Sequence, residues 1–251
     1  MMDSFGGWFI EPSGAHAVRT SYRFLAPTAQ CSYLPDQISR LEYEYVAELS
    51  LEEYSARMME GWRRFGHMLF RPRCEHCSAC RSLRVVVDRF QPNRNQRRVR
   101  KVNEGAVSLQ IGRPRVSSAR LNLYRRFHDD RARARGWSER YEDPISYHES
   151  FVSNPFPTEE WCFHLGGKLV GLGVVDALPV GLSAIYFVRD PEYHHRSLGT
   201  WNVLCLIDEA RRRGVPHLYL GYWVADCPSL AYKANFRPYE IMGPDGQWHP
   251  A

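Results

Sequence analysis

The pattern that most restricts the fold of this chain lies between residues 161 and 222. Three apolar segments have the length and composition of strands: residues 161–165, 168–176 and 183–188. Gly166-Gly167 and the Leu-Pro-Val-Gly sequence at 178–181 separate them, and both are turn-forming sequences. We therefore expect three consecutive antiparallel strands. The pattern then predicts a helix over residues 197–213 and another strand over 217–222.

A strand meander followed by a helix and a strand predicts an α/β fold with a core of the N-acetyltransferase (GNAT) type. Enzymes of this type that bind coenzyme A hold its pyrophosphate on backbone N–H groups of an R/Q-x-x-G-x-G/A turn. Here the turn reads His195-Arg-Ser-Leu-Gly-Thr-Trp201, in which Arg196 and Gly199 match the pattern. Trp201 takes the last small position, and we expect its indole to crowd the diphosphate. The sequence therefore predicts such a core without CoA.

The residues before this core form a block of their own. Strands are expected at residues 41–47, 67–70 and 83–90. Ser50 and Glu53 have the spacing of a capping box, which opens a helix that we expect to continue to about Arg64. A strand at 107–111 and a helix that begins near Ser117 or Ser118 open the second block. We therefore expect two domains, a smaller α/β domain that contains a cysteine cluster and the GNAT-like domain, at residues 1–104 and 105–251.

Three cysteines at intervals of three residues lie in the segment RPRCEHCSACRSLRV, residues 71–85. Cys74, Cys77 and Cys80, with Cys31 as a fourth thiolate, would suit a tetrahedral zinc ion or an iron–sulfur cluster. The alternative is a tightly turned loop whose reduced thiols pack as small hydrophobic groups. The spacing alone does not choose among these three.

The composition indicates the kind of partner and the compartment. Hydrophobic residues make up 44% of the 251 residues, as in folded globular proteins, and the net charge is +5. This basic balance favours a polyanionic partner. No apolar run approaches the ~18 residues of a membrane helix, and the start, MMDSFGGWFI, lacks the regions of a secretory signal. We therefore expect a cytosolic protein with reduced cysteines and no membrane partner.

Several motifs in correct order resemble the aminoacyl-tRNA–protein transferase family, and more narrowly its bacterial leucyl-transferring branch, related to the eukaryotic arginyltransferases. They are CSYLP (31–35), WRRFG (62–66), the cysteine segment, FQPNRNQRRV (90–99), YFVRDP (186–191), SLGT (197–200), LGYW (220–223) and AYK (231–233). Together they cover nearly the whole chain. Two positions depart from the family pattern: no second cysteine follows Cys31 closely, and Cys227-Pro-Ser-Leu230 replaces a Cys-x-Lys-Met sequence.

The resemblance implies transfer of an aminoacyl group, with leucine favoured over arginine, from charged tRNA to the N-terminal α-amine of proteins that begin with Asp or Glu. This marks them for degradation by the N-degron pathway. The tRNA ester is already activated, so positioning and oxyanion stabilisation are expected to dominate. We name Asp190 as a candidate base, Lys233 as a contact for the ester or terminal phosphate, and Tyr186 and Tyr222 as flanking groups. The alternatives are a turn for Asp190 and core packing for the tyrosines.

The resemblance also implies roles for arginines and for the thiols. The candidate tRNA-binding residues are Arg94, Arg97, Arg98, Arg100 and Lys101, with a solvated helix face as the alternative. Arg81 and Arg84 are candidates to read the acidic acceptor, because arginine meets a planar carboxylate with two parallel N–H donors. The alternative for Arg84 is an internal ion pair with Glu75 or Asp88. The family favours a cluster over zinc at the cysteines.

Two functions of other classes stay open on the residues alone. A CoA-dependent N-acetyltransferase would use Arg196 and Gly199 for pyrophosphate. A non-catalytic RNA-binding protein would use only the basic helices.

Overall fold

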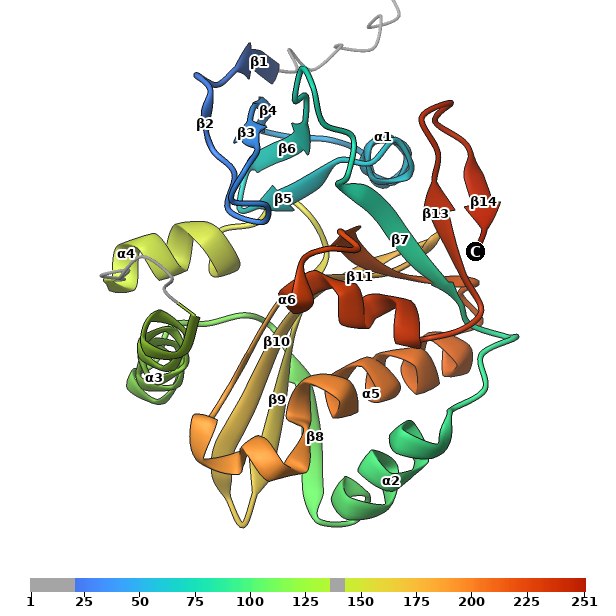
Figure 1. Cartoon of the computed structure of the whole chain (residues 1–251). Coiled ribbons are helices and arrows are strands. Elements are labelled where there is room, and N and C mark those ends of the chain that lie inside the picture. Colours follow the sequence, from blue (N-terminus) through green and yellow to red (C-terminus); the bar gives the residue numbers. More distant parts are fainter. Residues whose placement is uncertain (1–20, 136–142) are drawn as a thin grey trace, which may run out of the picture.

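A computed structural model describes residues 21–135 and 143–251, and most of them surround one mixed sheet (Figure 1). The sheet has the strand order β14-β13-β7-β12-β11-β10-β9-β8. Its strands are β7 (Arg81–Val86), β8 (Val107–Gly112), β9 (Thr158–Leu165), β10 (Lys168–Leu178), β11 (Gly181–Arg189), β12 (His217–Trp223), β13 (Tyr239–Met242) and β14 (Trp248–Pro250). The predicted meander of β9, β10 and β11 is confirmed. The N-terminal residues on which the expectation of no signal rests lie outside the described residues.

The middle of this sheet contains a strand from the N-terminal block. β7 precedes the expected domain boundary at residue 104, yet it pairs with β12 on one side and β13 on the other. β11 and β12 are parallel and are paired only at Leu182–Leu218 and Ser183–Tyr219. Beyond these residues they are no longer paired, so the sheet opens between their C-terminal ends.

Helices cover both faces of the large sheet. The helices are α2 (Arg94–Asn103), α3 (Ser118–Arg135), α4 (Pro144–Tyr147), the π-helix η1 (His148–Val152), the 3-10 helix η2 (Pro191–Arg196), α5 (Leu198–Arg212), α6 (Pro228–Ala231) and the 3-10 helix η3 (Tyr232–Asn235). β10 contributes to two cores: Val170 and Val175 pack with α5, and Leu172 and Val174 pack with α3. In the described part of the chain, no helix combines the length and the apolar character needed to cross a bilayer.

The N-terminal residues form a second, four-stranded antiparallel sheet in the order β1-β4-β6-β5. Its elements are β1 (Ser21–Leu25), β4 (Leu41–Val46), α1 (Leu51–Met59), β5 (Arg63–Phe65) and β6 (Met68–Pro72), and β2 (Ala29–Gln30) pairs with β3 (Ile38–Ser39) beside them. The capping box of Ser50 and Glu53 is confirmed. The expected helix to Arg64 is wrong: Gly61 has a φ of 90°, which ends the helix, and the next residues turn into β5.

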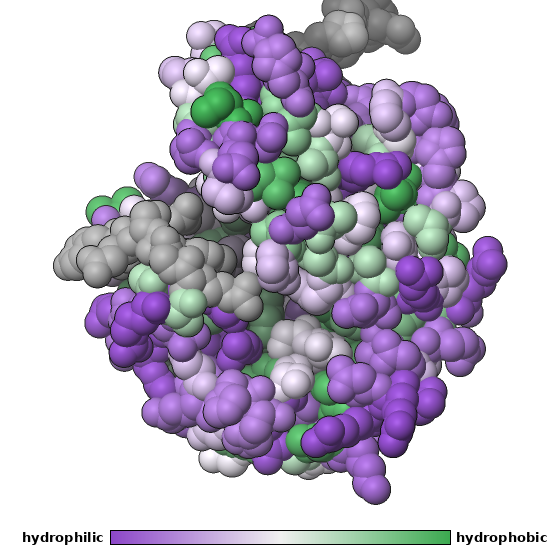
Figure 2. Space-filling view, viewed as in Figure 1, coloured by the Kyte–Doolittle hydropathy of each residue, from purple (hydrophilic) through white to green (hydrophobic). Residues whose placement is uncertain are grey.

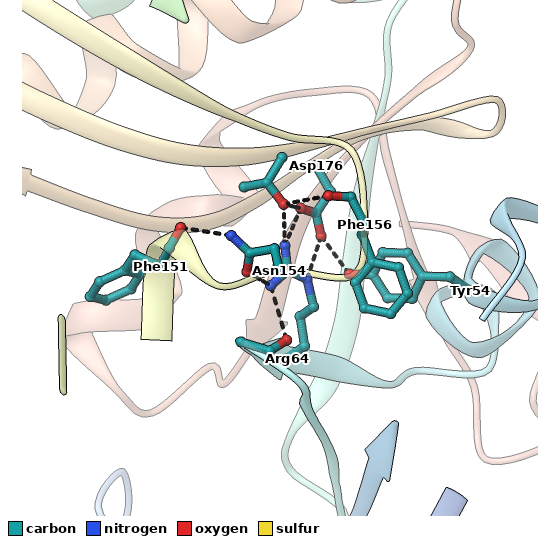
Figure 3. A network of polar contacts seen from close by, with 8 residues as sticks. Tyr54, Arg64, Phe151, Asn154, Phe156 and Asp176 are labelled. Carbon is teal, nitrogen blue, oxygen red and sulfur yellow. Dashed lines mark hydrogen bonds and ion pairs between the residues drawn. The ribbon is translucent and has the colours of Figure 1, made fainter. Parts of the chain in front are cut away.

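A buried polar network fastens this small sheet to the large one (Figure 3). Arg64 of β5 donates hydrogen bonds from both Nε and Nη2 to the carboxylate of Asp176 on β10, and its Nε lies 2.8 Å from Oδ2. Tyr54 of α1 donates to the same carboxylate at 2.6 Å. Asn154 and Thr158 accept hydrogen bonds from the remaining N–H groups of Arg64 at 2.5 and 2.6 Å. Every nitrogen of the guanidinium is therefore satisfied within the protein.

Candidate functional site

Arg63 lies on the opposite side of β5 from Arg64, because successive side chains of a strand point to opposite faces. Its side chain is only 6% exposed. Nη1 donates to the carbonyls of Met58 and Trp62 at 3.2 and 2.6 Å, whereas Nε and Nη2 have no hydrogen-bond partner among the residues that the structure describes. Burial lowers the pKa of the guanidinium. Within residues 21–135 and 143–251, no carboxylate lies at ion-pair distance from it.

Lys233 brings a second buried cation to the same place. It lies on η3, is 9% exposed, and donates from Nζ to the carbonyl of Tyr222 at 2.6 Å. Burial first, and then the charge of Arg63, lower its pKa to about 7. Both cations flank Gly221, where a methyl group would lie 3.7 Å from Nζ of Lys233 and 3.9 Å from Nε of Arg63. Arg63 and Lys233 therefore face the backbone of Gly221, and neither has a carboxylate partner among the described residues.

Tyr222 supports this site from β12. Its hydroxyl donates to the carbonyls of Gly61 and Phe70, at 2.8 and 3.2 Å, and its ring lies 5.6 Å from the guanidinium of Arg63. Burial raises the pKa of the phenol well above its ordinary value. The structure thus brings together two of the residues predicted from the sequence, Tyr222 and Lys233. It adds Arg63, which sequence reasoning quoted in the WRRFG motif but gave no role.

The cysteine loop adjoins the same site. Burial first, and then the charges of Cys31, Cys74, Cys77 and Cys227, raise the pKa of Cys80 to about 12. Such effects require proximity, so the four predicted thiols share one neighbourhood with Cys227, from the turn that departs from the family pattern. Among the described residues, no three His, Cys, Asp or Glu side chains are placed so that they could hold a metal ion. All four predicted ligands are free thiols, and the metal stays a prediction.

Asp190 and Tyr186 are the other two candidates for the reaction centre. The ring of Tyr186 lies 6.0 Å from that of Phe65 on β5, the strand that carries Arg63. The carboxylate of Asp190 is fully buried, pairs with Arg126 at 2.7 Å and Lys168 at 3.1 Å, and accepts the N–H of Glu192 at the start of η2. This geometry matches the alternative of a structural turn residue. The hydroxyl of Tyr186 lies 3.0 Å from Nε2 of His128.

A shallow apolar depression lies beside Tyr186, between α3, α4, η1 and strands β10 and β11. Its lining consists of Tyr124, Tyr147, Phe151, Leu172, Val174, Tyr186 and Val188. Figure 2 shows this face of the molecule hollowed between the N-terminal strands and the large sheet, with hydrophobic residues at the base of the hollow.

Arg81 and Arg84 face the C-terminal hairpin. Nε of Arg84 donates to Glu240 of β13 at 2.7 Å, and its guanidinium lies 4.3 Å from the ring of Trp248. Nε of Arg81 donates to the carbonyl of Met242 at 3.3 Å. The internal ion pair of Arg84 is therefore present, with Glu240 as its partner in place of Glu75 or Asp88. Along β7 the side chains alternate, since Leu83, Val85 and Val87 are buried and Arg84 lies on the other face. The acceptor role of both arginines stays a prediction.

The predicted tRNA-binding residues lie on α2. Arg94, Arg97, Arg98 and Lys101 are exposed, whereas Arg100 forms a two-bond ion pair with Asp208 of α5 at 2.7 and 3.0 Å. A polar pocket of about 210 Å³ separates α2 from the start of α5. Its lining consists of Asn95, Arg98, Val99, Val102, His195, Arg196 and Ser197.

Trp201 does not crowd the turn at the start of α5. Its side chain is 7% exposed and packs into the core beneath the helix, and it does not line the polar pocket. The expected obstruction by the indole is therefore wrong, because helical geometry turns this position toward the sheet. That the protein binds no CoA stays a prediction.

Comparison with known proteins gives the same result for both blocks of the chain. Residues 29–98 match the family profile "Arginine-tRNA-protein transferase, N terminus", and residues 119–243 match "Arginine-tRNA-protein transferase, C terminus". A protein of Marinobacter nauticus named aspartate/glutamate leucyltransferase is 40% identical over 92% of this chain and 96% of its own. Proteins of the same name from Halorhodospira halophila and Helicobacter hepaticus are 39% and 33% identical, over 85% and 87% of this chain and 90% and 91% of theirs.

Solved structures are more distant. The C-terminal domain of a putative lysylphosphatidylglycerol synthetase from Agrobacterium fabrum aligns with a TM-score of 0.47 and 10% identity. The alignment covers 68% of this chain and 58% of that one.

Proposed function

This chain belongs to the aminoacyl-tRNA–protein transferase family, and from that premise we propose that it transfers leucine from charged tRNA to proteins that begin with Asp or Glu. The observation that carries the proposal is the similarity, over nearly the full length, to relatives named aspartate/glutamate leucyltransferase. Such a reaction adds a leucine to the protein N-terminus, which marks the product for the N-degron pathway. Because charged tRNA is the proposed donor, we propose that the protein acts in the cytosol.

The chemistry requires orientation more than activation. The neutral α-amine of the acceptor attacks the ester carbonyl carbon, the bond to the ribose oxygen breaks, and an amide forms. The amine gives up one proton and the departing ribose hydroxyl gains one. Because the ester is already activated, holding both substrates in register supplies most of the rate. We propose that a GNAT-like core does so where β11 and β12 separate, since the meander, the parallel pair and α5 follow that order.

The proposal assigns the tRNA to the face of α2. Four of the five predicted contacts are exposed there, and Arg98 also lines the polar pocket at the start of α5. Binding through phosphates weakens with salt, with a log–log slope of roughly 0.7 to 0.9 per contact. We expect replacement of Arg97 and Arg98 by Ala to flatten that slope in a filter-binding titration with Leu-tRNA. Arg212→Ala, at the other end of α5, is the control and should not change the slope. An unchanged slope in the double variant would show that Arg97 and Arg98 belong to a solvated helix face that does not bind tRNA.

A direct assay tests the transfer itself. The protein is incubated with radiolabelled Leu-, Phe- or Arg-tRNA and with peptides that begin with Asp, Glu or Lys. We expect label from Leu-tRNA on the Asp and Glu peptides only. Transfer of arginine to the same peptides would identify an arginyltransferase, and acetylation from acetyl-CoA without any tRNA-dependent transfer would identify an N-acetyltransferase.

We further propose that Cys31, Cys74, Cys77 and Cys80 hold an iron–sulfur cluster or a zinc ion. The support is that Cys31, Cys74 and Cys77, from two distant segments, lie close enough to Cys80 to raise its pKa, and that thiolates are the donors both groups use. Either group would fix the loop that precedes β7. Protein purified without oxygen should carry a chromophore or stoichiometric zinc, and Cys77→Ser should lose it while Cys205→Ser, on α5, should not. Equal metal content in all three proteins would contradict the shared site.

A further inference from the structure

Arg63 and Lys233 are buried cations that lack what other buried cations of this chain have. Arg64 is paired with Asp176, and Arg120 is paired with Glu160. An uncompensated buried charge is costly, so a fold keeps one only where something else offsets the cost. Within the described residues, the nearest acceptors of Arg63 and Lys233 are backbone carbonyls alone.

The unused donors of Arg63 identify the chemistry of the missing partner. Nε and Nη2 form one edge of the guanidinium, and within residues 21–135 and 143–251 neither finds an acceptor. Arg64 binds Asp176 through the same two nitrogens, and so does Arg120 with Glu160, in each case one oxygen to each nitrogen. This fork fits the two oxygens of a carboxylate. The Nζ of Lys233 faces the same point of Gly221 and adds further N–H donors, with a second positive charge when it is protonated.

We propose that Arg63 and Lys233 bind the side-chain carboxylate of the N-terminal Asp or Glu of the acceptor protein, an assignment that rests on the proposed function. The confined setting favours this ligand over a tRNA phosphate. Both cations are more than nine-tenths buried, and a single methyl group on Gly221 would already contact both. A terminal carboxylate is small and planar, whereas a phosphodiester carries a nucleoside on each side.

This site explains selection of acids over their amides. Asn and Gln have the shape of Asp and Glu, but they offer the arginine fork one acceptor oxygen and one NH₂ group. The NH₂ group would face a cation and leave a buried donor unpaired. Discrimination then comes from the neutral ligand's failure to satisfy the fork as much as from attraction of the acid.

The experiment measures leucine transfer to two peptides that differ only in an N-terminal Asp or Asn. We expect Arg63→Met to lower kcat/KM for the Asp peptide by roughly 10- to 100-fold, the loss of one charge-assisted interaction, mainly through KM. The slow rate on the Asn peptide should stay the same or rise, because the variant also removes the donors that the amide leaves unpaired, so the preference for Asp collapses. Arg63→Lys should restore part of it. Arg213→Met, which removes an arginine paired with Glu159 and Glu209, is the matched control and should keep the wild-type preference.

Three outcomes separate this site from the proposed function. If the wild-type protein transfers leucine to neither peptide, the proposed function fails and this site with it. If transfer occurs and both Arg63→Met and Lys233→Met keep the wild-type preference, the site is wrong while the function stands. If Arg63→Met weakens binding of Leu-tRNA and leaves the preference intact, the fork binds phosphate and the proposal is overturned. Should Arg63→Met fail to fold by circular dichroism, Lys233→Met carries the same expectation.

Discussion

Arg63 and Arg64 are neighbours in sequence, both buried, and both on β5, yet the protein treats them in opposite ways. Arg64 uses all three of its nitrogens on Asp176, Asn154, Thr158 and the carbonyl of Gly66 (Figure 3). Arg63 uses one nitrogen on two carbonyls and leaves the others without partners. The closed network on one side of the strand joins two sheets. The open edge on the other side has what a ligand site needs, which is charge that the protein itself does not neutralise.

The largest effect is expected from removing the carboxylate that pairs with Arg64. Asp176→Ala leaves the Arg64 charge buried and unpaired, so the free energy of unfolding should fall by about 3–5 kcal/mol. Urea unfolding followed by circular dichroism measures it. Asp208→Ala, which removes the partly exposed partner of Arg100, is the control and should cost about 1 kcal/mol or less. Equal losses in the two variants would show that the Arg64 network does not fasten the sheets.

The pH dependence of the free energy of unfolding tests the state of Lys233, beside Arg63. The pKa of Lys233 is lowered to about 7 in the folded protein, by burial and by Arg63, whereas the unfolded chain keeps the ordinary value near 10.4. Between these values the unfolded state binds the extra proton, so stability should rise with pH from about 7 to 9. The slope should be at most about 1.4 kcal/mol per pH unit.

The groups that face Lys233 do not obscure this slope. Arg63 keeps its charge in this range, burial raises the pKa of Cys80 to about 12, and that of Tyr222 lies well above its usual value. Cys227 also acts on Lys233 and is unchanged in the comparison. Unfolding in urea at several pH values tests the expectation, and Lys233→Met should flatten the rise. A wild-type curve as flat as that of the variant would show that Lys233 keeps its proton.

The smallest change in the free energy of unfolding is expected from removing the charge of Arg63. Arg63→Met loses two hydrogen bonds to carbonyls but also removes an uncompensated buried charge, and these contributions have opposite signs. The free energy of unfolding at pH 8 should therefore change by less than about 1 kcal/mol. Arg64→Met, the matched variant one residue along, should lose several times more. A comparable loss in both would mean that Arg63 is as structural as its neighbour.

The sequence by itself determined the local elements and the family. Apolar segments and Gly-rich turns predicted β9 to β11, and the Ser50 capping box predicted the start of α1. These succeed because periodicity and capping act within a few residues. The order of the motifs along the chain also indicated the family, and the matches to both family profiles confirm it.

Only the tertiary structure decided which residues meet. Long-range pairing has no local signature, so the place of β7 between β12 and β13 could not be read from its alternation. For the same reason Asp190, a candidate base by sequence, proved to cap η2, and Trp201 turned into the core. Arg63 and Lys233 come together because the bulge in β12 at Gly221 brings bare backbone between them. Both cations are buried there, and no carboxylate of the described residues pairs with them. These are properties of the packed chain, and they make the two residues a candidate site for an acidic ligand.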